Sequence, residues 1–381
     1  MILAGCATSP PPLSSPKIAE FSDAEVLHGD WLFGREVTMA PPEPVLALSP
    51  EMEAFLTEEI TRSPFAYTRF KRLMRALVEH GYFANNYQVD GTFSAAQTFA
   101  DRRGNCLGYT NMFIALARAA RLDARYQFIE TYPVWGVQGS YLVKNNHINV
   151  LVDNIEMPGS RDAEVIVDFN IVQPDPETSK AKLVSDAYAL SLFHANIAVD
   201  YLGMGDSEAA FAHLKRAAHE APENIGVWSN LGVLYSKLGH PVGAQYAYER
   251  VLDIDPNDNT GWVGMVVALQ AQGKMVEAQE FNKRVEKYQL RNAYYHYAVA
   301  EQAFKRSEFD LVMTSVDEAI KRRRSEPKFY LLKAATAKEL GDLKLMDRNI
   351  ELAQRYQKKR NSFWGRTADS FERDNRLRFF E

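Results

Sequence analysis

Cysteine is nearly absent from this sequence, which has 381 residues and only two cysteines, Cys6 and Cys106. Two cysteines cannot make the dense disulfide framework of small secreted domains, so the fold must rest on packed apolar cores. No apolar run approaches the roughly 20 residues of a membrane-spanning helix. The formal charge of -5 is small for this length. It gives no bulk attraction to nucleic acid, so no nucleic-acid partner is predicted.

The residues that are present have the composition of a globular protein. Apolar residues make up 46% of the chain and charged residues 24%. A chain of this length is too long for one ordinary hydrophobic core, and it therefore predicts about two or three domains.

The N-terminus resembles a bacterial lipoprotein signal. Leu3-Ala4-Gly5-Cys6 is similar to a lipobox, in which Cys6 would become the acylated first residue, and residues 7–16 form a Pro- and Ser-rich tether. This resemblance implies a lipid-anchored protein of the bacterial cell envelope that faces the periplasm. It requires a basic and an apolar segment before Leu3; the alternative is a cytoplasmic protein with a disordered N-terminus.

A lone thiol stands at the predicted start of a helix. The turn Gly104-Asn105 leads into Cys106, and apolar residues recur at helical spacing from 111 to 120. The positive end of a helix stabilises thiolate over thiol, so Cys106 is a candidate nucleophile. The alternative is that Cys106 is a small buried apolar residue, the usual fate of an unpaired cysteine.

The segments on either side of this helix differ in their periodicity. Before it, Ser49-Pro50 begins a helical pattern that resumes after a break at Ser63-Pro64 and ends at Gly81. After it, alternating apolar residues predict strands at 124–129, 139–143, 147–152 and 164–168. Helices followed by antiparallel strands predict an α+β domain.

One histidine and one aspartate fall at the ends of these predicted strands. His147 begins the third strand and Asp168 ends the fourth. If the two strands pair, both side chains can face the helix start that carries Cys106, as a Cys-His-Asp triad. The alternatives are a strand histidine with ordinary hydrogen bonds and a carboxylate that caps a turn.

The residues around Cys106 carry a family resemblance. Residues 97–106 and 113–125 resemble the transglutaminase-like superfamily, which has a papain-like fold, and His147 and Asp168 match its histidine and aspartate strands. The resemblance covers about residues 90 to 170. The sequence departs from the family at the turn Ala120-Arg121-Leu122, where a glycine is usual, and at Phe169-Asn170, where Pro-Thr is often found.

The resemblance implies a chemistry and a set of roles. The Cys106 thiolate would attack a carboxamide or peptide carbonyl to give a thioester, with His147 as base and then acid and Asp168 fixing its tautomer. The backbone N–H of Cys106 would donate to the oxyanion, with the Gln97 side chain as a second donor. No cofactor and no metal site are predicted.

From about residue 190 the sequence repeats every 34 residues. One series is His194, Trp228, Trp262, His296 and Tyr330, and others run through Gly205 and Ala210. The block resembles tetratricopeptide repeats, most closely at 225–258. Five helical hairpins would stack into a curved solenoid whose groove accepts a protein partner.

These patterns together predict the domain bounds. Residues 1–16 are the lipobox and tether, 17–173 the transglutaminase-like domain, and 174–190 a linker. The five repeats occupy 191–360, and 361–381 is a capping helix or a tail.

Three functions are compatible with this organisation. The first is a cell-envelope cysteine peptidase or amidase whose repeats recruit a protein or peptide substrate or a partner, anchored to the membrane through Cys6. The second is a catalytically inert transglutaminase-like adaptor that acts through its repeats. The third is a transglutaminase that crosslinks proteins. The resemblance favours the first, because hydrolysis is the commoner outcome among bacterial members.

Overall fold

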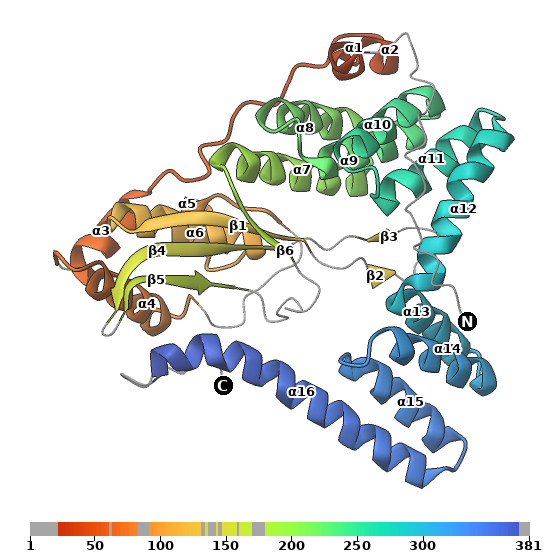
Figure 1. Cartoon of the computed structure of the whole chain (residues 1–381). Coiled ribbons are helices and arrows are strands. Elements are labelled where there is room, and N and C mark those ends of the chain that lie inside the picture. The colour runs from red at the N-terminus through yellow and green to blue at the C-terminus, as the bar shows by residue number, and fades with distance from the viewer. Residues whose placement is uncertain are drawn as a thin grey trace, which may run out of the picture. The chain divides into compact units, whose positions relative to one another are not determined.

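The chain folds as an α+β region with a small sheet, followed by a long series of helices (Figure 1). The computed structural model describes residues 22–60, 63–82, 91–130, 134–135, 142–143, 147–157, 160–169 and 180–372. The chain divides into two compact units. The first takes in residues up to 130, 146–174 and 180–283, and the second takes in 131–145, 175–179 and 284–381. The predicted order of an α+β domain before an all-helical region is confirmed.

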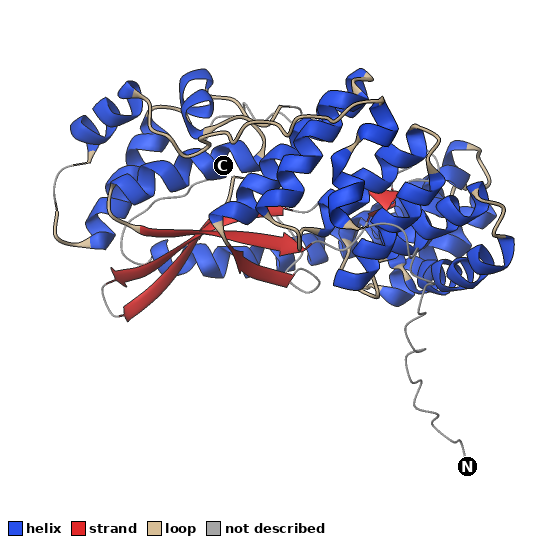
Figure 2. Cartoon of the chain, turned by 90° about the horizontal axis from the view of Figure 1, so that it is seen from above, coloured by secondary structure: helices blue, strands red, loops and turns tan. Residues whose placement is uncertain are grey.

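A four-stranded antiparallel sheet forms the centre of the α+β region, and Figure 2 shows its strands lying side by side. The strand order is β5 (Ser160–Val167), β4 (His147–Met157), β1 (Asp123–Glu130) and β6 (Lys180–Val184). In the register of the sheet, Leu151 of β4 lies opposite Arg125 of β1 and Ile166 of β5. The strands predicted at 124–129, 147–152 and 164–168 are confirmed, with β4 and β5 longer than expected.

Two parts of the predicted strand pattern differ from the structure. β6 lies inside the stretch 174–190 that the sequence indicates as a linker, and it pairs with β1. Its five residues follow a Pro-rich stretch and form too short a pattern to reveal a strand in the sequence. Pairing with β1 supplies the backbone hydrogen bonds of this strand. In the second unit, β2 (Val134–Trp135) pairs with β3 (Leu142–Val143), which is the described part of the strand predicted at 139–143.

Four helices surround the start of the sheet region. They are α3 (Pro50–Glu59), α4 (Ala66–Glu79), α5 (Ala95–Asp101) and α6 (Cys106–Ala119). Ser49 caps α3 with a proline in its first turn, as the sequence predicts. α6 packs on β1 and β4, and it also contacts the other three helices. Because these contacts enclose α6 on nearly every side, its residues from Leu107 to Ala117 are all buried. A helix enclosed in this way must be apolar nearly all round.

Residues 22–40, called the N-terminal arm below, contain two short helices that the sequence did not predict. They are α1 (Asp23–His28) and α2 (Asp30–Phe33). Helices of six and four residues are too short for periodicity to show, and they are unstable without tertiary contacts. The contacts that stabilise them must therefore come from elsewhere in the chain.

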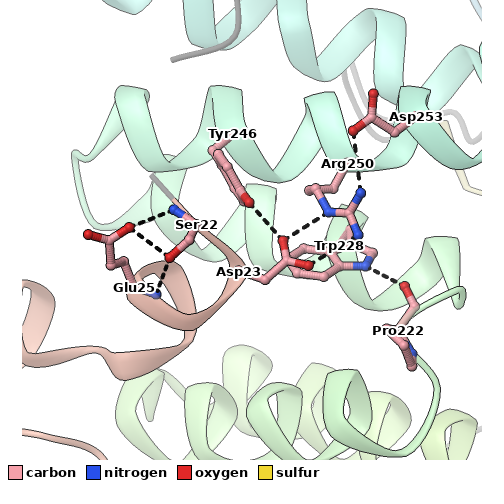
Figure 3. A network of polar contacts seen from close by, with 8 residues as sticks. All are labelled: Ser22, Asp23, Glu25, Pro222, Trp228, Tyr246, Arg250 and Asp253. Carbon is pink, nitrogen blue, oxygen red and sulfur yellow. Dashed lines mark hydrogen bonds and ion pairs between the residues drawn. The ribbon is translucent and has the colours of Figure 1, made fainter. Parts of the chain in front are cut away.

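The N-terminal arm packs on two repeat helices of the same unit, α8 (Ser207–Glu220) and α10 (Pro241–Ile254). Val26 and Val37 are buried in the hydrophobic cluster of these helices. Asp23 accepts hydrogen bonds from the Tyr246 hydroxyl at 2.8 Å and from Arg250 Nε at 2.9 Å (Figure 3). The arm is thus an integral part of the first unit.

Five helix pairs follow the sheet, as the 34-residue period predicts. The pairs are α7 (Asp186–Met204) with α8, α9 (Ile225–Lys237) with α10, α11 (Asn259–Ala271) with α12 (Met275–Arg291), α13 (Ala293–Lys305) with α14 (Phe309–Arg322), and α15 (Pro327–Glu339) with α16 (Leu343–Glu372). Gly232 of α9 has a steric reason to be glycine, because a Cβ there would lie 2.5 Å from the Tyr248 ring of α10.

The aromatic position of the repeat has a polar role that recurs with the same period. Its side chain donates a hydrogen bond to the backbone carbonyl six residues upstream, before the start of its own helix. The pairs are Trp228 to Pro222 (2.8 Å), Trp262 to Pro256 (3.2 Å), His296 to Leu290 (3.1 Å) and Tyr330 to Arg324 (2.9 Å). The period therefore preserves a hydrogen bond as well as an apolar contact, which explains why histidine and tyrosine can replace tryptophan here.

The last helix passes through the predicted end of the repeats. α16 runs from Leu343 to Glu372, so a helix occupies most of the segment 361–381, for which the sequence predicts a capping helix or a tail. Among the described residues, no helix has both the length and the apolar character needed to cross a bilayer.

The first repeat contains a buried histidine pair in place of the aromatic hydrogen bond. His194 is buried, and its Nδ1 lies 3.0 Å from Nδ1 of His213. Burial, together with the nearby His213 and Arg216, lowers the pKa of His194 to about 4. Burial also lowers the pKa of His213. The folded repeat therefore favours the neutral form of both rings.

Acidification should destabilise this repeat. An unfolded histidine titrates near 6.5, so between that pH and about 4 the unfolded chain binds more protons than the folded one and stability falls with pH. The His194→Phe variant keeps an aromatic ring at the repeat position and should lose most of this pH dependence. Amide hydrogen exchange of α7 and α8 at about pH 7 and about pH 5 measures the effect. Equal losses of protection in wild type and variant would contradict it.

Candidate active site

The start of α6 is held in place by the residue that precedes the thiol. Asn105 is the N-cap: its Oδ1 accepts a hydrogen bond from the Gly108 backbone N–H at 3.0 Å, and its Nδ2 donates to Thr92 Oγ1 at 2.7 Å. Gly108 allows close packing, because a Cβ there would lie 2.9 Å from Thr98 Oγ1. Cys106 is thereby fixed as the first residue of the helix, half-buried and not in a disulfide.

Two side chains of α6 join the thiol-bearing helix to the sheet. Thr110 Oγ1 donates to the backbone carbonyl of Ile148 on β4 at 3.3 Å, and Asn111 Oδ1 accepts from the Tyr126 hydroxyl on β1 at 2.6 Å. Ile148 follows His147 directly, so the bond from Thr110 fixes the position of His147 relative to the start of α6.

The structure brings His147 and Asp168 into direct contact. His147 Nε2 lies 2.7 Å from Asp168 Oδ1 and 2.8 Å from Oδ2, so Nε2 carries the proton and donates it to the carboxylate. The two side chains are only 4% and 13% exposed. Low exposure strengthens such a charge-assisted hydrogen bond.

The second ring nitrogen of His147, Nδ1, takes no part in the contact with Asp168. Nδ1 is buried and has no hydrogen-bond partner among the described residues, while the Cys106 thiol is near enough to the ring to raise its pKa. The structure therefore gathers all three residues of the predicted triad, in the order Cys106, His147, Asp168 across the site. Whether they catalyse a reaction stays a prediction.

Opposing influences act on the pKa of His147. Burial lowers it, while hydrogen bonds and charge interactions with Asp168 and Cys106 raise it, and the net result is a pKa of about 9. Because this lies above the unfolded value of 6.5, the stabilisation is fully present below pH 6.5 and is lost as the pH rises through about 9. The site favours an imidazolium at neutral pH.

Two neighbours hold Asp168, and sequence reasoning assigned a role to neither. Asn149 Nδ2 donates to Asp168 Oδ2 at 3.1 Å. The Phe169 ring stacks on Tyr109 of α6, with 5.7 Å between ring centroids, and also contacts Phe113. Phe169, a departure from the family pattern, thus packs the end of β5 against α6. The signal for Asn149 was the strand alternation that places it on the same face as His147.

Comparison with known families agrees with this geometry. Residues 55–150 match the family model of the transglutaminase-like superfamily, a range that contains Cys106 and His147 and ends before Asp168. The α+β region contains a transglutaminase-like core. Residues 225–258 match a tetratricopeptide repeat, the unit that the sequence indicated as most regular.

Several solved structures are similar to this chain over less than half of its length. MamA from Desulfovibrio magneticus RS-1 is 16% identical, with 46% of this chain and 97% of that chain covered and a TM-score of 0.26. A thermophilic tetratricopeptide-repeat protein of Thermus thermophilus is 19% identical, with 48% and 98% covered and a TM-score of 0.26. A tetratricopeptide-repeat protein of Parabacteroides merdae is 15% identical, with 44% and 65% covered and a TM-score of 0.26. No curated protein matches the chain.

The other predicted site residues have different placements. Gln97 is an exposed residue of α5, and its Oε1 accepts hydrogen bonds from the Ser94 backbone N–H at 3.0 Å and the Ser94 hydroxyl at 3.2 Å, as a capping box. Its role beside the transglutaminase-like site stays a prediction. Cys6 lies outside the described residues. Within the described ranges, no group of three or more His, Cys, Asp or Glu side chains could hold a metal ion.

Proposed function

We propose that this chain is a thiol-dependent acyl-transfer enzyme, a cysteine peptidase or amidase. The observation that supports it best is the buried His147 ring, which contacts the Asp168 carboxylate through Nε2 and interacts with the Cys106 thiol strongly enough to raise the pKa of the ring. A base between a nucleophile and an orienting carboxylate is the arrangement that such chemistry requires.

The proposed reaction follows from which nitrogen holds the proton. Because Nε2–H is donated to Asp168, the lone pair of Nδ1 takes the proton of the Cys106 thiol. The thiolate attacks a carboxamide or peptide carbonyl, and the oxyanion accepts from the Cys106 backbone N–H at the start of α6. His147 Nδ1–H then protonates the leaving amine, and a thioester on Cys106 remains.

Deacylation restores the enzyme. His147 removes a proton from water as the water attacks the thioester, and the thiol departs with the carboxylic acid as product. A primary amine in place of water would give a new amide, which is the crosslinking reaction. Hydrolysis is the proposed outcome, because it is the commoner one among the bacterial members that the sequence resembles.

The remaining parts of the chain fit an enzyme that receives a protein or peptide. The repeats are proposed to recruit the substrate or a partner, as the helix pairs and the repeat match support. The lipobox-like sequence at Leu3 to Cys6 supports an anchor in the bacterial cell envelope.

A peptide library with mass-spectrometric readout tests the reaction. The wild type should generate new peptide termini, or glutamine side chains converted to glutamate, and Cys106→Ser should lower their rate by at least about 10³-fold. Added labelled primary amine should stay largely unincorporated. Identical products from wild type and Cys106→Ser would sink the proposal, whereas amine adducts in excess of hydrolysis would replace the peptidase with a transglutaminase.

A further inference from the structure

Asn149 contacts Asp168, the carboxylate of the proposed triad. It lies two residues after His147 on β4, and the register that pairs Val150 with Val167 brings it alongside Asp168. Its Nδ2 donates to Asp168 Oδ2 at 3.1 Å, while His147 Nε2 contacts both carboxylate oxygens. Asn149 itself is 3% exposed.

The other half of the Asn149 carboxamide is poorly accommodated. Its Oδ1 is buried and has no hydrogen-bond partner among the described residues. A buried acceptor without a partner costs folding free energy, and an apolar side chain of the same shape would avoid that cost. Packing alone therefore favours leucine over asparagine here, and the contact with Asp168 is what only the asparagine provides.

That contact has two physical consequences for Asp168. A donated N–H stabilises the ionised form of a carboxylate, which is the form that accepts a hydrogen bond from His147 Nε2–H. It also restrains rotation of the carboxylate, which keeps both oxygens against the histidine. Phe169, stacked on Tyr109, restrains the backbone at the same point.

We propose that Asn149 is a positioning residue of the active site, which holds the Asp168 carboxylate oriented toward His147. This inference rests on the proposed acyl-transfer function, in which the Asp168 carboxylate sustains the imidazolium of His147 and, through it, the thiolate of Cys106. Asn149 touches neither the substrate carbonyl nor the thiol in this scheme. Its loss should change the charge state of the site more than the stability of the fold.

Asn149→Leu in the full chain is the test, with two readouts. The pKa of His147, followed by NMR of labelled histidine, should fall below its wild-type value, because a carboxylate that is free to rotate loses part of its contact with Nε2–H. The alkylation of Cys106 by iodoacetamide at about pH 5 should slow by about fivefold. The melting temperature should stay equal or rise, because the unpartnered Oδ1 is gone. Asn149→Gln, which retains a carboxamide donor, should recover part of both readouts.

Leu151→Val is the matched control, because Leu151 is a buried residue two positions further along the same strand. It should leave the His147 pKa and the alkylation rate unchanged. If Asn149→Leu fails to fold, Asn149→Ala provides the same comparison. An unchanged His147 pKa in a folded Asn149 variant would overturn the inference while the proposed function stands. Slow alkylation of wild-type Cys106, equal to that of His147→Ala, would instead overturn the proposed function.

Discussion

His147→Ala should slow the alkylation of Cys106 by iodoacetamide at about pH 5 by roughly tenfold or more. An ordinary thiol, with a pKa of about 8.5, is only about 0.03% thiolate at that pH. An imidazolium beside a thiol favours the thiolate, and the gain in thiolate exceeds the loss in intrinsic nucleophilicity that accompanies a more acidic thiol. The raised pKa of His147, to about 9, ensures that the ring is charged under these conditions.

A second histidine of the same domain provides the control. His80 is exposed and contacts Glu59 at 3.0 Å, away from the thiol-bearing helix start. His80→Ala should therefore leave the alkylation rate unchanged. If both variants reacted as fast as the wild type, the contact between His147 and Cys106 would have no chemical consequence.

Trp228→Ala should be the most destabilising single substitution that we predict in the repeats, at about 3–5 kcal/mol. Trp228 is 1% exposed, and its Nε1 donates to the Pro222 carbonyl at 2.8 Å (Figure 3). The Arg250 guanidinium lies 5.1 Å from its ring centroid and also holds Asp23 of the N-terminal arm. The variant therefore loses apolar burial and a buried hydrogen bond, and it leaves Arg250 without its aromatic support.

Trp262→Ala is the matched control, because it removes the same side chain from the same position one repeat later. Trp262 makes the equivalent bond to the Pro256 carbonyl at 3.2 Å but is only half-buried. Its replacement should cost about half as much. Amide hydrogen exchange of α9 and α10 in the full chain reports the local cost. Equal losses at the two tryptophans would show that burial does not determine the effect.

The repeats and the site were predictable for different reasons. A 34-residue period is visible because each repeat must present the same packing surface to its neighbour. The same residue pattern therefore recurs in all five repeats. The placement of His147 and Asp168 followed from strand alternation and from the family resemblance. The helix start at Cys106 followed from the turn Gly104-Asn105, which the structure shows as an N-cap.

Other features depend on contacts that no local pattern records. The N-terminal arm forms α1 and α2 because repeat helices about 200 residues later stabilise them. These helices bury Val26 in their hydrophobic cluster and donate hydrogen bonds to Asp23. The bond from Asn149 to Asp168 depends on the register between β4 and β5, and that register shifts between Val152 and Ile155. Such an irregularity cannot be counted from strand ends in the sequence.

We propose that Cys106 and His147 form a thiolate–imidazolium pair, and the ultraviolet absorbance of the thiolate tests this pair most directly. A pH titration of the wild type minus Cys106→Ser cancels the contribution of Cys6 and every tyrosine. Thiolate absorbance should persist at about pH 6 in the wild type and should be absent at that pH in His147→Ala. Absorbance that emerges only above about pH 8, with or without His147, would contradict it.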